Sequence, residues 1–152
     1  MNWEYIKDRG IKSSDSKIEI YFDTKKEEID KVLLPNSITS QGRSINEYCY
    51  SNIFESGLDI RLNFDDGLLS EIEVLEGAVF ISGVNVQIER SIKLATLKLR
   101  VKGHRYFKHT NGYTFPNLKI DLGDQYKNGG ERSVVCWIYT AKNIEHLFDD
   151  QS

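Results

Sequence analysis

The sequence predicts an α+β domain in which two or three helices pack on a mainly antiparallel β-sheet. Short runs in which apolar and polar residues alternate, as expected of half-buried strands, recur along the chain. Turn pairs such as Asp66-Gly67 and Asn111-Gly112 separate some of these runs, which is typical of antiparallel hairpins. Residues 24–33 and 90–102 instead place apolar side chains at helical spacing.

Residues 1–152 are predicted to form one domain. The length is close to the commonest domain size, and a hydrophobic fraction of 39% can supply one core. No repeat, low-complexity segment or linker rich in proline and glycine interrupts the sequence. Charged residues make up 28% of the chain and the net charge is −3, which suits a folded, water-exposed surface.

The location predicted from the sequence is the cytoplasm. Residues 1–5 lack the basic start and apolar core of a signal peptide, and no apolar run approaches the roughly 20 residues that span a bilayer. No membrane association is expected. Cys49 and Cys136 could in principle pair, but in a reducing compartment we interpret both as small buried hydrophobic residues.

A strand and then a helix are predicted near the N-terminus. Residues 17–22 alternate and contain β-branched and aromatic side chains, which favours a strand with one buried face. Thr24 and Glu27 fit a capping box at the start of a helix. One face of that helix carries Ile29, Val32 and Leu33.

Pro35 is expected to end this helix, because proline cannot continue the helical hydrogen bonding. The polar residues 36–44 are predicted to form a loop. Residues 48–50 are then expected to form a short strand.

The clearest local signal is a hairpin over residues 58–75. Apolar and polar residues alternate in residues 58–64 and again in residues 70–75. Asp65-Asp66-Gly67 separates the two arms, and glycine tolerates the positive φ that a tight turn demands. Alternation in both arms predicts one apolar face against the core and one acidic face toward water or a partner.

Charge is distributed unevenly along the middle of the chain. Between Glu55 and Glu89 the single base is Arg61, whereas acidic residues recur throughout. The following stretch contains no acid and carries Arg90, Lys93, Lys98, Arg100, Lys102, Arg105 and Lys108.

The basic stretch is ambiguous between helix and strand. Residues 84–88, after the turn residue Gly83, are predicted to form a strand. A helix over residues 90–102 would place on one face Ile92, Ala95, Leu99 and Lys102. A strand would instead place on one face Leu97, Leu99 and Val101. We predict the helix, with Gly103 as its C-cap.

A second hairpin and two more strands are predicted after this helix. Asn111-Gly112 joins residues 105–108 to residues 113–115, and residues 118–122 alternate.

A turn at Asn128-Gly129-Gly130 leads to residues 133–139, which are predicted to form a nearly fully buried central strand. A helix over residues 141–148 is expected to close the chain.

Several turn and core residues occur in an order similar to one seen in known proteins. They are residues 62–67, residues 72–74, Gly83 with the following helix, residues 113–118 and residues 134–137. Over roughly residues 57–139 this order resembles small uncharacterised bacterial cytosolic proteins, some of which look like immunity partners of polymorphic toxins. The resemblance implies toxin inhibition and brings no catalytic residues. Residues 1–52 have no counterpart in it, and the basic helix departs from the more acidic versions expected.

No sequence motif for catalysis or metal binding is found. A P-loop, a G-x-S-x-G elbow, H-E-x-x-H and paired C-x-x-C are all missing. Asp65-Asp66-Gly67 does not fit a calcium loop, because Leu62 and Phe64 occupy two of the earlier ligand positions. We therefore predict a protein that is not an enzyme and that binds neither cofactor nor metal.

The histidines offer two further candidates. His104 and His109 flank two aromatic residues in a basic segment, which could contact a single-stranded nucleic acid. The pI near 5.6 argues against this, so we do not expect a nucleic-acid partner and interpret both as surface residues. His146, beside Glu145, could be half of a metal site, but we interpret it as a solvated helix end.

Several tyrosines are expected near turns and loops, where they could anchor a protein interface or pack across strands. They are Tyr48, Tyr50, Tyr106, Tyr113 and Tyr126.

The leading hypothesis is a non-enzymatic protein-binding module of the immunity type, whose acidic face occludes the basic active site of a toxin. The residues expected to contact this partner are Asp59, Asp65, Asp66, Glu71, Glu73 and Glu76. One alternative is a small-molecule-binding domain or an unfamiliar enzyme with a pocket lined by aromatics and by His104 or His109. Another is a self-associating structural subunit. The oligomeric state is not predicted.

Overall fold

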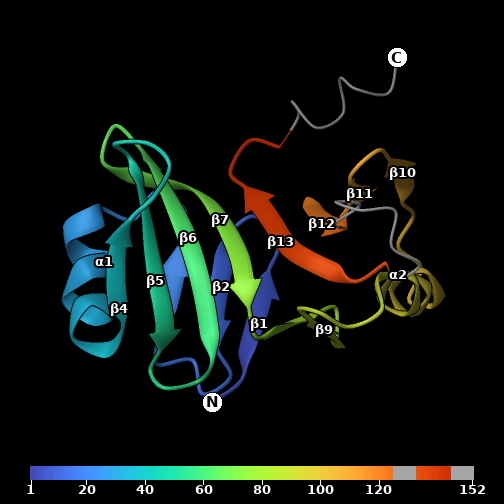
Figure 1. The fold of residues 1–152 in the computed structure, drawn as a ribbon, viewed down its shortest axis with the longest axis horizontal. Helices are drawn as coiled ribbons and strands as arrows, with labels where there is room; N and C mark the ends of the chain where they lie inside the picture. The colour runs from blue at the N-terminus through green and yellow to red at the C-terminus, as the bar shows by residue number, and fades with distance from the viewer. Residues whose placement is uncertain (125–132, 145–152) are drawn as a thin grey trace.

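Two β-sheets and two α-helices make up the described part of the chain in the computed structural model, which covers residues 1–124 and 133–144 (Figure 1). Most of the chain is antiparallel β-structure, as the sequence predicts. The helices are few and short, so the sheets supply most of the architecture.

The smaller sheet has five strands in the order β3-β2-β1-β8-β9. Their bounds are β1 Trp3–Ile6, β2 Gly10–Ser13, β3 Glu19–Tyr21, β8 Ala78–Ile81 and β9 Val84–Gln87. All neighbouring pairs are antiparallel except β1 and β8, which run parallel and meet at Glu4 and Phe80. The N-terminal strands are thus joined in one sheet to strands from the middle of the chain.

The larger sheet has eight strands in the order β10-β11-β12-β13-β7-β6-β5-β4, and all its pairs are antiparallel. The first four in the chain are β4 Ile38–Gln41, β5 Glu47–Ile53, β6 Leu58–Asp65 and β7 Leu68–Glu76. The others are β10 Phe107–His109, β11 Gly112–Phe115, β12 Ile120–Asp124 and β13 Val135–Ala141.

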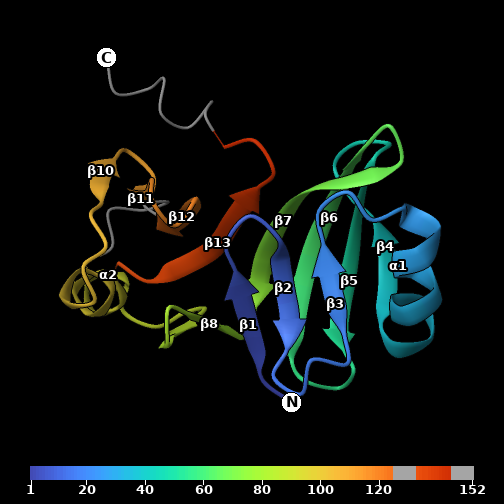
Figure 2. The ribbon, with the colours of Figure 1, turned by 180° about the vertical axis from the view of Figure 1, so that it is seen from behind.

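The core lies between the two sheets. Figures 1 and 2, taken from opposite sides, show β1, β2 and β3 on one side of β5, β6 and β7. Alternate residues of each strand point into this space, as their two-residue periodicity predicts. From the large sheet come Tyr50, Ile60, Leu62, Ile72 and Val74, and from the small sheet come Trp3, Ile11 and Ile20. Each is at most 2% exposed, and full burial of such a side chain stabilises the fold by roughly 1.5–3 kcal/mol.

The predicted hairpin is confirmed as β6 and β7. Asp65 pairs with Leu68, and the two residues between them, Asp66 and Gly67, adopt φ of 52° and 76°. Positive φ at both central positions is the geometry that matches the twist of a two-residue hairpin.

Helix α1 (Lys26–Leu33) lies close to β5. The hydroxyl of the buried Tyr50 in β5 donates a hydrogen bond to Asp30 Oδ1 in α1 at 2.7 Å. The predicted capping box is wrong. The N-cap is Lys25 and has no side-chain capping bond, because the chain up to Lys25 is still extended and Thr24 accepts a backbone hydrogen bond from Leu69.

The buried face of α1 contains Ile29 and Leu33, whereas Val32, predicted to share that face, is 39% exposed. The helix ends at Leu33, and Pro35 lies in the short 3-10 helix η1 (Leu34–Asn36) that follows.

The prediction of a loop over residues 36–44 is wrong, because this stretch contains the edge strand β4. All four of its side chains are exposed, and it is held by backbone pairing with β5. Without a buried face, β4 shows no alternation of apolar and polar residues.

The basic stretch forms helix α2 (Ile92–Val101), as predicted. The Ser91 side chain caps it by accepting from the Leu94 amide at 3.2 Å. Lys102 is the C-cap, and Gly103, predicted for that role, follows it with φ of 95°. The helix buries Ile92, Ala95, Thr96 and Leu99, whereas Lys102 is exposed.

The hairpin predicted at Asn111-Gly112 is confirmed as β10 and β11, but its two turn residues are Thr110 and Asn111, because Gly112 already pairs with His109. Strand β12 begins two residues later than predicted, because Leu118 and Lys119 lie in the turn after β11. Lys119 has φ of 56°, which is incompatible with an extended strand.

Strand β13 is central, between β12 and β7, as predicted. The expectation of near-complete burial is wrong, because Cys136, Trp137 and Tyr139 are only half-buried. Cys49 is also half-buried, so the interpretation of the two cysteines as buried residues is wrong.

The predicted C-terminal helix does not begin at Ala141, which is the last residue of β13 and pairs with Glu71. The rest of that prediction from residue 145 onward lies outside the described residues. The same holds for the turn at residues 128–130, for Tyr126 and for His146. Within the described residues, no helix has both the length and the apolar character needed to cross a membrane.

Candidate functional site on the outer face of the large sheet

The outer face is defined here as the face of the eight-stranded sheet that points away from the five-stranded sheet. Side chains of directly paired residues in neighbouring strands point to the same side of a sheet. The register of five adjacent pairs therefore aligns one row across the outer face, and most of its members are polar. The row comprises Cys49, Arg61, Glu73, Tyr139, Asp121 and Thr114.

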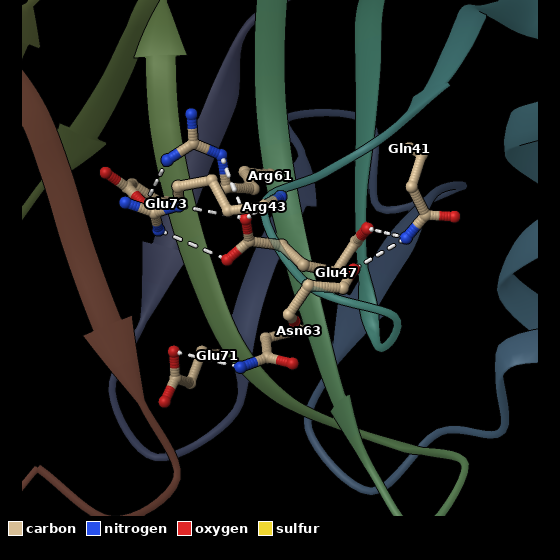
Figure 3. A network of polar contacts seen from close by, with 8 residues as sticks. Gln41, Arg43, Glu47, Arg61, Asn63, Glu71 and Glu73 are labelled. Carbon is tan, nitrogen blue, oxygen red and sulfur yellow. Dashed lines mark hydrogen bonds and ion pairs between the residues drawn. The ribbon is translucent and has the colours of Figure 1, made fainter.

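Two arginines and two glutamates form an ion-pair network at one end of this row (Figure 3). Arg43 donates to Glu47 through Nε to Oε1 at 3.0 Å and through Nη2 to Oε2 at 3.1 Å. Arg61 Nη1 donates to Glu73 Oε2 at 3.1 Å, and its Nε lies 3.5 Å from Glu47 Oε1. Arg43 Nη2 also reaches Glu73 Oε2 at 3.4 Å. The four charges alternate and cancel.

The network perturbs its own ionisation. The hydrogen bonds from Arg43 hold the pKa of Glu47 below its ordinary value and, in return, raise the pKa of Arg43. The Glu47 side chain is only 8% exposed, and the Arg61 side chain is 20% exposed. At neutral pH the Glu47 carboxylate is therefore ionised, and the carboxylates of both Glu47 and Glu73 are already engaged by the two arginines.

A second polar group follows on the same face. Glu71 accepts from Asn63 Nδ2 at 3.5 Å. Burial, followed by the neighbouring Glu71 carboxylate, raises the pKa of the Tyr139 hydroxyl above its ordinary value. The Tyr139 hydroxyl therefore stays protonated over the physiological range.

We use the name turn end for the end of the large sheet at which the β4–β5 loop (residues 42–46) lies next to the β6–β7 turn (residues 65–68). The Phe64 amide donates to the Asn46 carbonyl at 3.0 Å, which joins the two connections. Ile45 in the loop is 82% exposed, and Asp65 and Asp66 in the turn are exposed as well.

A depression of about 420 Å³ lies between this turn end and the end of β13. Its lining includes Ser44, Asn46, Asp65, Glu71 and Lys142. Lys142 is paired with Asp23 at 2.7 Å, so its charge is already balanced.

The six predicted partner-binding acids are split by this geometry. Asp65, Asp66 and Glu71 lie at the turn end, and Glu73 is neutralised by the two arginines of the network. The remaining two, Asp59 and Glu76, pair at the opposite end of the hairpin.

Asp59 and Asp65 are separated by about 20 Å along β6, at about 3.4 Å per residue. Asp59 also accepts a hydrogen bond from the Asn52 amide at 2.7 Å. One partner surface can therefore use the three acids of the turn end together more readily than all six.

A buried carboxylate, Asp121, organises the far end of the row. It accepts from Thr114 Oγ1 at 2.8 Å and from Trp137 Nε1 at 3.4 Å, and its Oδ1 lies 2.6 Å from His109 Nε2. The backbone N–H of Asn111 donates to His109 Nδ1, so Nδ1 acts as an acceptor and carries no proton. The ring proton therefore lies on Nε2, which donates to Asp121. Both ring nitrogens of His109 are thus occupied.

His104 is bound elsewhere, with Nε2 at 2.8 Å from Ser82 Oγ. Within residues 1–124 and 133–144, no cluster of three or more potential metal ligands is found among histidine, cysteine, aspartate and glutamate.

Most of the tyrosines predicted near loops pack inside the fold. Tyr50 is fully buried, Tyr48 packs against Phe64 with ring centroids 6.2 Å apart, and Tyr106 packs against Tyr113 at 5.3 Å. They fit the cross-strand interpretation rather than that of exposed anchors.

Arg43 and Ile45 were not among the residues predicted from the sequence. An exposed isoleucine inside an otherwise polar stretch was the available signal for Ile45. Arg43 lies in a loop, four residues before its partner Glu47, and its second partner, Glu73, comes from the distant strand β7.

In comparisons with known proteins, no family model, no curated protein and no solved structure matches this chain.

Proposed function

We propose that this chain is a protein-binding module that uses its turn end to engage a basic protein partner, as an immunity-type inhibitor does when it occludes a toxin active site. The observation that carries the proposal is the exposed Ile45, whose chain neighbours Ser44 and Asn46 line the same depression as Asp65 and Glu71. Asp66 is exposed in the adjoining turn. An exposed apolar side chain with a polar rim is the usual anatomy of a protein interface.

The two components have different roles in binding. Burial of Ile45 would supply affinity, because removing an isoleucine side chain from water is worth roughly 1.5–3 kcal/mol. The three carboxylates would mainly accelerate association with a basic surface and select against acidic partners. The ion-pair network would keep the adjacent β-strands rigid, so that the loop and turn are held ready for contact.

Charge reversal at the turn end tests the proposal. The triple variant Asp65→Lys, Asp66→Lys, Glu71→Lys and the wild type are used as baits for affinity capture from lysate of the source cells. We expect the wild type to retain a basic protein that the triple variant loses. With that protein purified, the association rate constant of the wild type should fall as the salt concentration rises.

The matched control reverses three exposed acids elsewhere, in the variant Glu4→Lys, Glu19→Lys, Glu55→Lys. Both variants change the net charge by the same amount. The control should retain the captured protein, and Ile45→Ser should raise the dissociation rate constant without slowing association. Equal capture by the two triple variants, or capture of no protein that depends on the turn end, would refute the proposal.

The pocket alternative receives less support. Neither His104 nor His109 lines any of four depressions found on the surface of the described residues. We therefore do not propose a small-molecule site at these histidines.

A further inference from the structure

Helix α2 and strand β9 lie on the other side of the molecule from α1 (Figure 1). The two elements contact each other, and residues of both line a groove. The first turn of α2 lies near Gln87, and its last turn lies near Gly83. The helix therefore runs back along the strand. At its C-terminal end the helix is tied to the β8–β9 turn by the contact between His104 and Ser82.

Two depressions occupy this groove. The first, of about 280 Å³, is lined by Asn85 and Gln87 of β9 and by Leu94 and Lys98 of α2, among others. The second, of about 400 Å³, is lined by Val84 and Asn85 together with Leu97, Lys98 and Val101, among others. Asn85 and Lys98 line both depressions, so the two form one continuous groove along β9.

Strand β9 is an edge strand of the small sheet, and among the described residues it pairs with β8 alone. The Ile88 amide donates to the Gly77 carbonyl on the β8 side. In an antiparallel ladder, successive residues turn their backbone groups to opposite sides. The N–H groups of Asn85 and Gln87 and the C=O group of Asn85 therefore point away from β8, where an additional strand can pair with them.

The helical wall exposes three apolar side chains. Leu94, Leu97 and Val101 are 51%, 55% and 78% exposed, respectively. Their spacing of three and four residues places them on one face of α2, separate from the buried face that contains Ile92 and Leu99. An exposed strand edge beside an exposed apolar helix face is the arrangement in which extended peptides bind as added strands.

The charge of the groove restricts what can bind there. Its lining includes Arg90, Lys98 and Lys102, and none of them forms an ion pair with another described residue. No acid occurs in the sequence between Arg90 and Lys108. An acidic segment would neutralise these cations, whereas a basic segment would be repelled.

We propose that the groove between β9 and α2 binds an extended acidic segment of a protein partner, which pairs with β9 and packs apolar side chains against α2. At about 3.4 Å per residue, the four residues of β9 match four to five residues of such a segment. This inference is independent of the proposed use of the turn end. A protein segment fits better than a lipid surface, because the groove is concave and has backbone groups on one wall.

The test uses a display library of random ten-residue peptides, selected on the immobilised wild-type chain. We expect enrichment of sequences in which aspartate or glutamate alternates with apolar residues. The most enriched peptide, labelled with fluorescein, is then titrated with the wild type and its variants while fluorescence polarisation is recorded. The double variant Leu97→Asp, Val101→Asp loses two apolar contacts with the peptide. Its Kd for the peptide should rise by about tenfold or more, and a tenfold change corresponds to about 1.4 kcal/mol.

Matched controls separate the groove from general surface effects. The variant Leu34→Asp, Ile38→Asp changes two apolar residues that are also exposed but lie outside the groove, and it should bind like the wild type. Lys98→Glu, Lys102→Glu should weaken binding, whereas Lys7→Glu, Lys17→Glu should not. The turn-end triple variant should retain the peptide, so failure of one proposal is distinguishable from failure of the other. Circular dichroism checks that each variant is folded.

Three results would overturn this inference. The first is a selection that enriches no acidic sequences. The second is a peptide affinity that Leu97→Asp, Val101→Asp leaves unchanged. The third is sedimentation of the chain with phosphatidylserine vesicles that depends on Leu97 and Val101, with no peptide binding, which would identify the face as a membrane-contact surface instead.

Discussion

Replacement of Arg61 by methionine should test whether the ion-pair network stabilises the large sheet. Methionine retains much of the apolar stem and removes the charge. The lost interactions are the hydrogen bond to Glu73 at 3.1 Å and the ion pair with Glu47 at 3.5 Å. A hydrogen bond to a charged group contributes about 1.5–3 kcal/mol.

Arg43 remains beside both glutamates in this variant, which offsets part of the loss. We therefore expect the free energy of unfolding to fall by about 2 kcal/mol at pH 7. For a chain of this size that lowers the melting temperature by roughly 4–8 °C.

The pH dependence provides the sharper part of the test. The pKa of Glu47 is lower in the folded state than in the unfolded chain, so its stabilising contribution is present above its unfolded pKa and is lost as the pH falls through its folded pKa. Arg43 makes the largest contribution to this lowering and Arg61 a smaller one. The part of the difference between wild type and Arg61→Met that comes from Glu47 should therefore shrink as the pH is lowered below about 4.3, the ordinary pKa of glutamate.

Urea unfolding monitored by circular dichroism, repeated from pH 7 to pH 3, measures this difference. Arg105→Met is the matched control, because Arg105 is exposed and its loss should cost at most about 0.5 kcal/mol. A loss below that value for Arg61→Met would show that the network contributes little to stability. A larger loss that does not change with pH would show that it does not come from the ionised glutamates.

Two further predictions concern packing and burial. A Cβ atom on Gly123 would lie 1.7 Å from the ring of Trp137, so Gly123→Ala should lower the free energy of unfolding by about 2 kcal/mol or more. If Trp137 is also replaced by alanine, the change at position 123 should be nearly neutral. A double-mutant cycle of urea unfolding measures both effects. Burial raises the pKa of Tyr5 to about 12, so the unfolded chain loses this proton first and stability should fall as the pH rises from about 10 toward 12. Tyr5→Phe should remove one late-titrating group from the tyrosinate absorbance curve; an unchanged curve would contradict the assignment.

Sequence reasoning succeeded where the structural signal is local. The β6–β7 hairpin was predictable because alternation and the turn residues lie within one short stretch. Helix α2 was predictable because its buried residues recur at helical spacing. Both features depend on residues that are close in the chain.

Sequence reasoning failed where structure depends on distant parts of the chain. Strand β4 exists because β5 offers it a backbone partner, and its own exposed side chains carry no pattern. The charge balance of Glu73 depends on Arg61, twelve residues away in β6, and on Arg43 in a loop. An acidic residue in sequence is therefore a weak guide to free negative charge until strand register is known.

The parallel pairing of β1 with β8 has a consequence for how the chain acquires its structure during synthesis. Glu4 meets Phe80, so the first strands of the small sheet lack this neighbour until residue 80 has left the ribosome. At about 5–20 residues per second that interval lasts roughly 4–15 s, during which β1 lacks its parallel neighbour in the small sheet. Nascent chains halted before β8 should therefore be more susceptible to protease and to chaperone binding than chains halted after β9.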